Sequence, residues 1–164
     1  MKAGDTILST VRPNRRSFLF LSSPSSIAVA STGFAVLTPT PAVDARYLYY
    51  WVTRQDFTDY LSLHAKGAAY PAVSAEDIGG AEIDIPPLPV QQRIAGILSA
   101  YDELIENSQR RIKILEAMAR GLYREWFVHF RFPGHENHPR VASALGEIPE
   151  GWVVKSVADA FVIS

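Results

Sequence analysis

The feature that most constrains this chain is a proline-free stretch over residues 90–132 with an apolar heptad pattern. Nine of the ten residues at its two recurring positions are apolar or small, and only Ser108 is polar. At about 1.5 Å per residue the stretch predicts one helix of roughly 60 Å. The pattern places an apolar stripe along one side of this helix, and a stripe of this length requires a partner. The candidate interface residues are Ile94, Leu98, Tyr101, Ile105, Ile112, Leu115, Leu122 and Trp126.

The flanks of the stripe indicate which kind of partner it needs. Ile97, Leu104 and Met118 widen it, which favours an antiparallel helix or a helix bundle over a narrow two-stranded zipper. The alternative is a long core helix of the same domain. The preceding residues are too few to cover such a length, so we expect a separate partner.

Prolines and local charge divide the chain into three parts. A proline cluster around Pro87 precedes the helix and Pro133 follows it, and helices commonly start or stop at such residues. The whole chain has a formal charge of −1, and only the middle part is basic. The predicted parts are residues 1–88, 89–132 and 133–164.

The first part combines strands and helices. Asp44 is a candidate N-cap for a helix or helix pair over residues 45–64, and the alternation of Ile83 with Ile85 predicts a final strand over 78–85. The β-rich runs are Ile7 to Val11, Phe18 to Leu21 and Ile27 to Leu37. The predicted fold class is α+β, with first strands that look incomplete.

A second interpretation of the N-terminal region is a signal peptide. Arg15-Arg16 followed by Phe18 has a twin-arginine look, and residues 28–30 imitate a cleavage site. The apolar stretch between them is interrupted by the Ser/Pro run 22–26, whereas such stretches normally continue for about 7 to 15 residues. We therefore favour two strands joined by a Ser/Pro turn.

The third part resembles the opening of a further domain. It continues through the run Leu145-Gly146-Glu147-Ile148-Pro149-Glu150-Gly151-Trp152, and Val153-Val154 then predicts the start of a strand. The preceding histidines, His129, His135 and His138, span a Pro-Gly break. A solvated linker explains them better than a metal site does.

Catalytic and cofactor motifs do not occur in the sequence. It has no Gly-rich phosphate loop, no nucleophile elbow and no cysteine, so we predict no catalytic residue, no metal and no cofactor. The absence of cysteine favours the cytoplasm slightly. No apolar run is long enough to predict a membrane-spanning helix.

Two polar loops are candidate nucleic-acid contacts. The first surrounds Pro13 and holds Arg12, Asn14, Arg15 and Arg16, whose guanidinium and amide groups suit phosphates or base edges. The second follows the helix pair, and its candidate residues are Lys66, Tyr70 and Ser74. The alternative for both loops is a solvated turn.

The junction Pro86-Pro87-Leu88-Pro89-Val90-Gln91-Gln92-Arg93-Ile94-Ala95 resembles the specificity (S) subunit of type I restriction-modification systems. The stretches Asp102 to Asn107 and Leu122 to Phe127 resemble that family's conserved helix. Upstream, Gly4 to Leu8 and Tyr70 to Ser74 are similar to the second half of a target recognition domain. Residues 145–152 resemble the opening of the next recognition domain.

The resemblance implies a non-catalytic, DNA-reading subunit. Its partners would be double-stranded DNA, methyltransferase (M) subunits and, where present, the nuclease-translocase (R) subunit, with self-association through the long helix as a further expectation. The implied order is a partial recognition domain, one coiled-coil helix and the start of a second recognition domain. Met1-Lys2-Ala3 would then be an internal or truncated start. The alternative function is a scaffold remnant that binds partner subunits without binding DNA.

Overall fold

The computed structural model describes residues 1–25 and 27–162; Ser26, Ile163 and Ser164 lie outside the described residues. The chain divides into two compact units, Met1–Ile105 and Glu106–Ser164. Helix α4 (Leu88–Tyr123) begins in the first unit and ends in the second.

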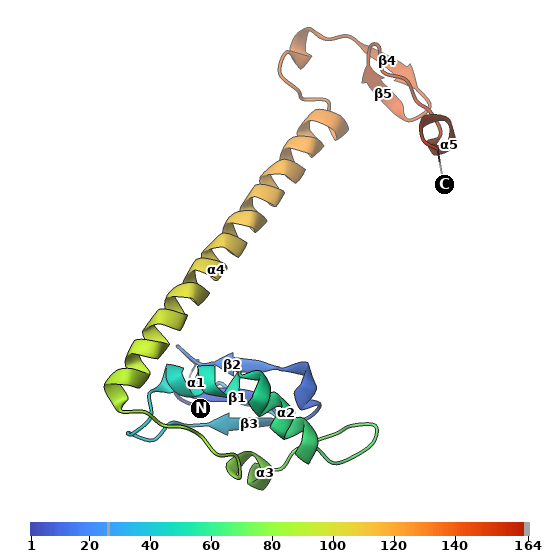
Figure 1. Ribbon diagram of the computed structural model, residues 1–164. Coiled ribbons are helices and arrows are strands. Elements are labelled where there is room, and N and C mark those ends of the chain that lie inside the picture. The colour runs from blue at the N-terminus through green and yellow to red at the C-terminus, as the bar shows by residue number, and fades with distance from the viewer. Residues whose placement is uncertain (26, 163–164) are drawn as a thin grey trace. The chain divides into compact units, whose positions relative to one another are not determined.

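The first unit is an antiparallel sheet covered on one face by helices (Figure 1). The sheet order is β2-β1-β3, with β1 in the centre. The strands are β1 (Thr6–Ser9), β2 (Phe18–Phe20) and β3 (Phe34–Leu37). The helices before α4 are the 3₁₀-helical turn η1 (Pro13–Arg15), α1 (Ala45–Val52), α2 (Gln55–His64) and α3 (Ala75–Gly79).

Strand register decides which side chains enter the core. Leu8 pairs with Phe18 and Ala35 on the two neighbouring strands, and these three residues share the face that carries the helices. Ile7 points to the opposite face because successive residues of a strand alternate. The core consists of Leu8, Val52, Phe57, Leu61, Val73 and Ile78.

The sequence correctly predicts three strands but is wrong about their connection. β2 and β3 do not form a hairpin through the Ser/Pro segment, because each pairs with β1. Residues 27–33 contain no strand, and β3 begins only at Phe34. β1 takes the central position because Thr6, Ile7 and Leu8 are all buried, whereas β2 and β3 alternate between more and less exposed residues.

The predicted helix pair is confirmed. The Asp44 carboxylate caps α1 by accepting hydrogen bonds from the backbone N–H groups of Arg46 (3.0 Å) and Tyr47 (2.9 Å). α1 ends at Val52, and α2 starts at Gln55 after a two-residue break.

The predicted strand over residues 78–85 is wrong. Ser74 and Asp77 form a capping box: the Ser74 hydroxyl accepts from the Asp77 N–H (3.1 Å), and the Asp77 carboxylate accepts from the Ser74 N–H (2.8 Å). This local closure starts α3, which ends at Gly79. Residues 81–87 then have no regular secondary structure and do not join the sheet.

A buried glutamine attaches the start of α4 to the rest of the first unit. The Gln91 side chain is fully buried, and its Oε1 accepts from the backbone N–H of Asp44 (2.8 Å). Its Nε2 donates to the carbonyls of Ala42 (3.1 Å) and Pro86 (2.7 Å). One amide therefore joins the cap of α1 to the segment that leads into α4.

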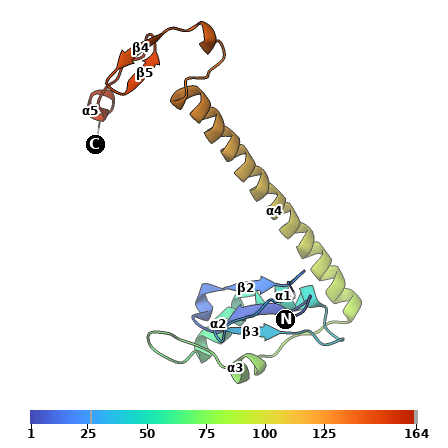
Figure 2. The ribbon, with the colours of Figure 1, turned by 180° about the vertical axis from the view of Figure 1, so that it is seen from behind.

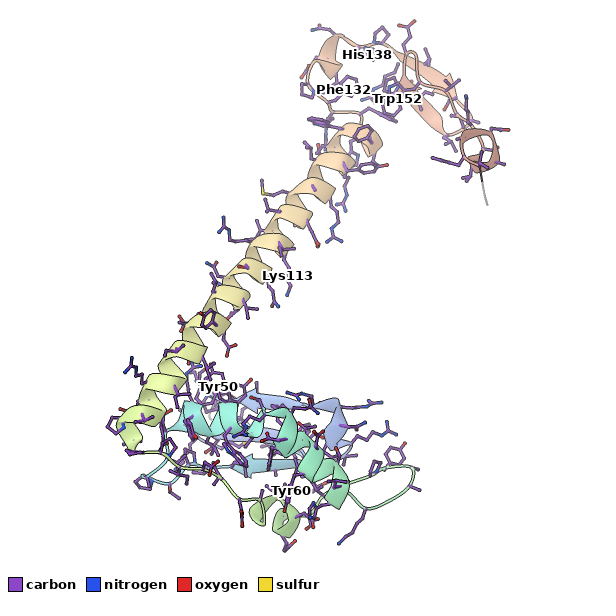
Figure 3. All side chains as sticks on the ribbon, viewed as in Figure 1. Tyr50, Tyr60, Lys113, Phe132, His138 and Trp152 are labelled. Carbon is purple, nitrogen blue, oxygen red and sulfur yellow. The ribbon has the colours of Figure 1, made fainter. Side chains whose placement is uncertain are left out.

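A second anchor lies further along the same face of α4. The Tyr50 hydroxyl donates to Oδ2 of Asp102 (2.6 Å) and lies 3.2 Å from the Ser99 Oγ (Figure 3). Ala95 and Ser99 are buried between the two anchors. About the first four turns of α4 are thus held on the first unit.

The second unit starts with a change of helix type. The His129 N–H donates to the Arg124 carbonyl (2.9 Å), an i to i+5 bond, and α4 passes into the π-helical turn η2 (Arg124–Val128). Trp126 lies in this turn. The long helix predicted over 90–132 is confirmed, except that its last four residues lie outside the helix.

A small β-hairpin follows, which the sequence pattern does not predict. Its strands are β4 (Arg140–Ser143) and β5 (Gly146–Pro149) (Figure 2). The 3₁₀-helical turn η3 (His135–Asn137) precedes it, and the short helix α5 (Val157–Ala160) follows it. Trp152, after β5, contacts the rings of Phe127 and Phe130 at centroid distances of 6.0 and 5.4 Å (Figure 3). The predicted strand at Val153-Val154 is wrong, because these residues are not in a strand. The hairpin escaped prediction because Val141 and Ile148 form its only large aliphatic pair.

The Gln91 anchor predicts a position-specific loss of stability. We expect Gln91→Leu to lower the free energy of unfolding by about 2–4 kcal/mol, because the Asp44 N–H and two carbonyls would be buried without partners. Urea denaturation followed by circular dichroism measures this. Gln92→Leu is the matched control, since Gln92 is exposed and should change stability by less than about 0.5 kcal/mol. Equal effects of the two substitutions would contradict the anchor.

The hydrogen bonds of the Asp5 carboxylate predict that the folded protein loses stability in acid. Its buried carboxylate accepts from the Lys2 backbone N–H and the Thr38 hydroxyl, both at 2.7 Å, and these bonds lower its pKa. The resulting stabilisation is complete above the ordinary aspartate pKa of about 3.9 and is lost as pH falls through the lower pKa of the folded state.

Thr38→Val should therefore shift the acid unfolding midpoint to higher pH, which a pH titration of circular dichroism measures. Thr40→Val is the control, because Thr40 is exposed and its side chain does not contact Asp5. An unchanged midpoint in Thr38→Val would show that the hydroxyl does not hold the carboxylate in its charged form.

Candidate nucleic-acid interface

The first polar loop is a tight turn between β1 and β2. Arg12 and Arg16 flank η1 with left-handed backbone angles (φ 51° and 54°), which are uncommon for residues other than glycine. Pro13 is buried within the turn, whereas Asn14 and Arg15 are exposed. The turn therefore presents polar side chains from a fixed backbone.

The structure brings the two predicted loops together. The Arg12 backbone N–H donates to the Pro71 carbonyl (2.7 Å), and its side chain donates to the Ala69 carbonyl (3.3 Å). The Arg12 guanidinium also lies 4.6 Å from the centre of the exposed Tyr70 ring. These contacts join η1 to the loop between α2 and α3, which Figure 2 shows from behind.

The backbone reinforces this junction. An isolated β-bridge between Ala72 and Val11 joins the two loops, and a second bridge between Ala72 and Lys66 closes the second loop on itself. Lys66 is exposed beside this bridge. Residues more than fifty positions apart in sequence therefore lie on joined loops. We call the polar residues of these two loops the loop surface: Arg12, Asn14, Arg15, Lys66 and Tyr70.

Two further predicted site residues form hydrogen bonds within the chain. The Arg16 guanidinium donates to the Thr53 carbonyl (2.5 Å) and to the Gln55 side-chain oxygen, which ties η1 to the break between α1 and α2. The Ser74 hydroxyl caps α3. Within residues 1–25 and 27–162, the Arg15 guanidinium makes no hydrogen bond or ion pair, and its charge faces solvent.

The apolar stripe of α4 is exposed along its length. Leu98 is 39% exposed, Ile105 54% and Leu115 62%, and Trp126 is half-buried in η2. Successive residues of an α-helix are 100° apart around its axis, so the stripe lies on the helix face next to the one that carries Gln91. Docking of α4 onto the first unit therefore leaves the stripe uncovered.

The other charges of α4 are partly neutralised within the helix. Arg110 pairs with Glu106 (3.0 Å) and Arg120 pairs with Glu116 (2.9 Å), both one turn apart and exposed. In the part of the chain that the structure describes, no group of three His, Cys, Asp or Glu residues could hold a metal ion. No described helix is both long and apolar enough to cross a membrane.

The structure thus combines an α+β unit that carries two joined polar loops with a long helix whose apolar stripe is exposed. The family model of the type I restriction modification DNA specificity domain matches residues 2–117. The chain belongs to this family.

Individual relatives agree. The specificity subunit of the type I restriction enzyme MjaIX of Methanocaldococcus jannaschii is 34% identical over 127 residues, which are 77% of this chain and 29% of that protein. The HindI specificity subunit of Haemophilus influenzae is 28% identical over 133 residues, again 29% of its length. The chain thus spans less than a third of these relatives.

A solved structure confirms the fold. The crystal structure of the HsdS subunit from Thermoanaerobacter tengcongensis matches with a TM-score of 0.54 and 25% sequence identity. The match covers 76% of this chain and 32% of that one. The predicted α+β fold class and the resemblance to specificity subunits are therefore both confirmed.

Proposed function

We propose that this chain supplies DNA sequence recognition to a type I restriction-modification complex and has no catalytic activity of its own. The observation that carries the proposal is the loop surface, in which Arg12 joins η1 to the loop around Tyr70. Membership of the DNA specificity domain family supports it. Methyl transfer and strand cleavage would belong to partner subunits, and the complex would work in the cytoplasm.

On the loop surface each side chain has a distinct chemical role. Arg15 and Lys66 contact DNA phosphates, since both are exposed cations. Asn14 reads a base edge through its amide, and Tyr70, held by Arg12, packs against a sugar or base. Arg16 and Ser74 support this surface by fixing η1 and α3.

In this proposal the stripe on α4 binds other subunits. Its partner is a second helix, from an M subunit or from another copy of this chain, and an R subunit joins where one is present. Residues 1–88 are then the C-terminal part of a recognition domain, and residues 133–164 begin another. A scaffold without DNA binding would retain the stripe but would not need the loop surface.

Arg15 provides the test of DNA contact. In a complex assembled with M subunits, Arg15→Gln should weaken binding to all duplexes about equally. It should also lower the slope of log affinity against log salt by about one, because one phosphate contact is lost. Fluorescence anisotropy over a series of salt concentrations measures both quantities.

Arg93→Gln is the matched control, because it removes the same charge from an exposed position on α4 outside the loop surface. It should leave the salt slope unchanged. If Arg15→Gln binds every duplex with wild-type affinity and slope, Arg15 makes no phosphate contact.

The proposed interface predicts that a charge placed on the stripe of α4 prevents association, whereas a charge on another face of α4 does not. Ile112→Asp would place an unpaired charge in an apolar helix interface, at a cost of several kcal/mol, and should abolish association. Ile114→Asp makes the same change at nearly the same exposure, 54% against 55%, but about 200° around the helix. Size-exclusion chromatography with light scattering, with and without M subunits, should therefore separate the two variants. Similar behaviour of both variants would contradict the assigned interface.

A further inference from the structure

A surface cavity in the first unit is independent of the loop surface. It has a volume of about 420 Å³ and lies where the end of α1, α2 and the segment after α3 meet. Aromatic side chains form its walls, and two carboxylates lie at its edge. The lining residues are Trp51, Asp56, Phe57, Tyr60, Ala81 and Glu82, with Gly80 at the turn.

The aromatic walls are held rigidly. Trp51 and Phe57 have ring centres 4.8 Å apart, and the Phe57 and Tyr60 rings are nearly parallel at 6.3 Å. The Tyr60 hydroxyl donates to the Asp77 carbonyl (3.0 Å), which fixes the ring on the side of α2 that faces α3 (Figure 3). Phe57 is buried, and the half-buried Tyr60 ring packs against the His64 ring at a centroid distance of 4.2 Å. The half-buried Trp51 ring offers surface to a ligand.

The charge around the cavity is negative. The charged residues that line it within the described part of the chain are two carboxylates, Asp56 and Glu82. Asp56 is paired with Arg54, whereas within the described residues Glu82 makes no ion pair and is exposed at the edge of the cavity. This sign is opposite to that of η1, so the cavity repels DNA phosphates and attracts a cation.

We propose that this cavity receives an arginine side chain from a basic segment of a partner protein. A guanidinium can stack on the Trp51 ring while it pairs with the Glu82 carboxylate, and arginine suits such a site because it is planar and always charged. The cavity is open at the surface, so an arginine carried on a polypeptide can reach it. The curated relatives are named as subunits, which agrees with a protein partner.

A short peptide tests the proposal directly. The probe is a fluorescein-labelled nine-residue peptide of glycine and serine with two arginines, titrated with the full chain. Its alanine counterpart is the negative control. The arginine peptide should bind saturably and shift the indole N–H resonance of Trp51 in two-dimensional NMR spectra, whereas the alanine peptide should do neither.

Charge variants distinguish binding of the peptide at this cavity from general attraction to the negative charge of the protein. Glu82→Gln should weaken the arginine peptide about two- to fivefold, the range expected for one exposed ion pair or cation–π contact. Asp59→Asn is the matched control, because Asp59 carries the same charge on α2 but does not line the cavity. It should change affinity by less than the Glu82 substitution, and Glu82→Lys should abolish binding.

Three outcomes would overturn the proposal. They are no saturable binding of the arginine peptide, equal weakening by the Glu82 and Asp59 substitutions, and no shift of the Trp51 resonance at saturation. Binding of DNA is measured in parallel, and Glu82→Gln should leave it unchanged. A failure of the cavity proposal is thereby distinguishable from a failure of the proposed DNA recognition.

Discussion

The first unit depends on the burial of one neutral amide, that of Gln91. Its three hydrogen bonds satisfy an N–H at the cap of α1 and two carbonyls in the segments before α1 and α4. A buried polar group of this kind is stable only when its partners are present in the correct geometry. The amide therefore specifies one relation between the sheet-and-helix core and the first turns of α4.

The Gln91 anchor determines which side of α4 faces the first unit and which side is exposed. Gln91, Ala95 and Ser99 use one face of the helix for contact with the first unit, and Tyr50 closes that contact at Asp102. The apolar stripe lies on the neighbouring face and stays accessible. A polar face attaches α4 to its own domain, and an apolar face is available for another helix.

The first unit also separates its charges. Arg12 and Arg15 lie on the loop surface, whereas the region around Glu82 is acidic and contains aromatic rings. In the proposed functions, the loop surface meets a polyanion and the cavity meets a basic protein segment, so the two ligands would not compete. The tie between Arg16 and the start of α2 connects the basic turn to the helix that lines the acidic cavity.

The sequence by itself determined the local features. The heptad pattern defined α4, Asp44 marked the start of α1, and the junction motif identified the family, because each depends on residues close together in the chain. Only the tertiary structure placed β1 between β2 and β3, joined Arg12 to Tyr70 and buried Gln91. These features depend on contacts between distant residues, and no periodicity or local propensity encodes them. The strand predicted over 78–85 failed because its first residues belong to α3, which the Ser74–Asp77 capping box starts, and because Ile83 and Ile85 do not pair with the sheet.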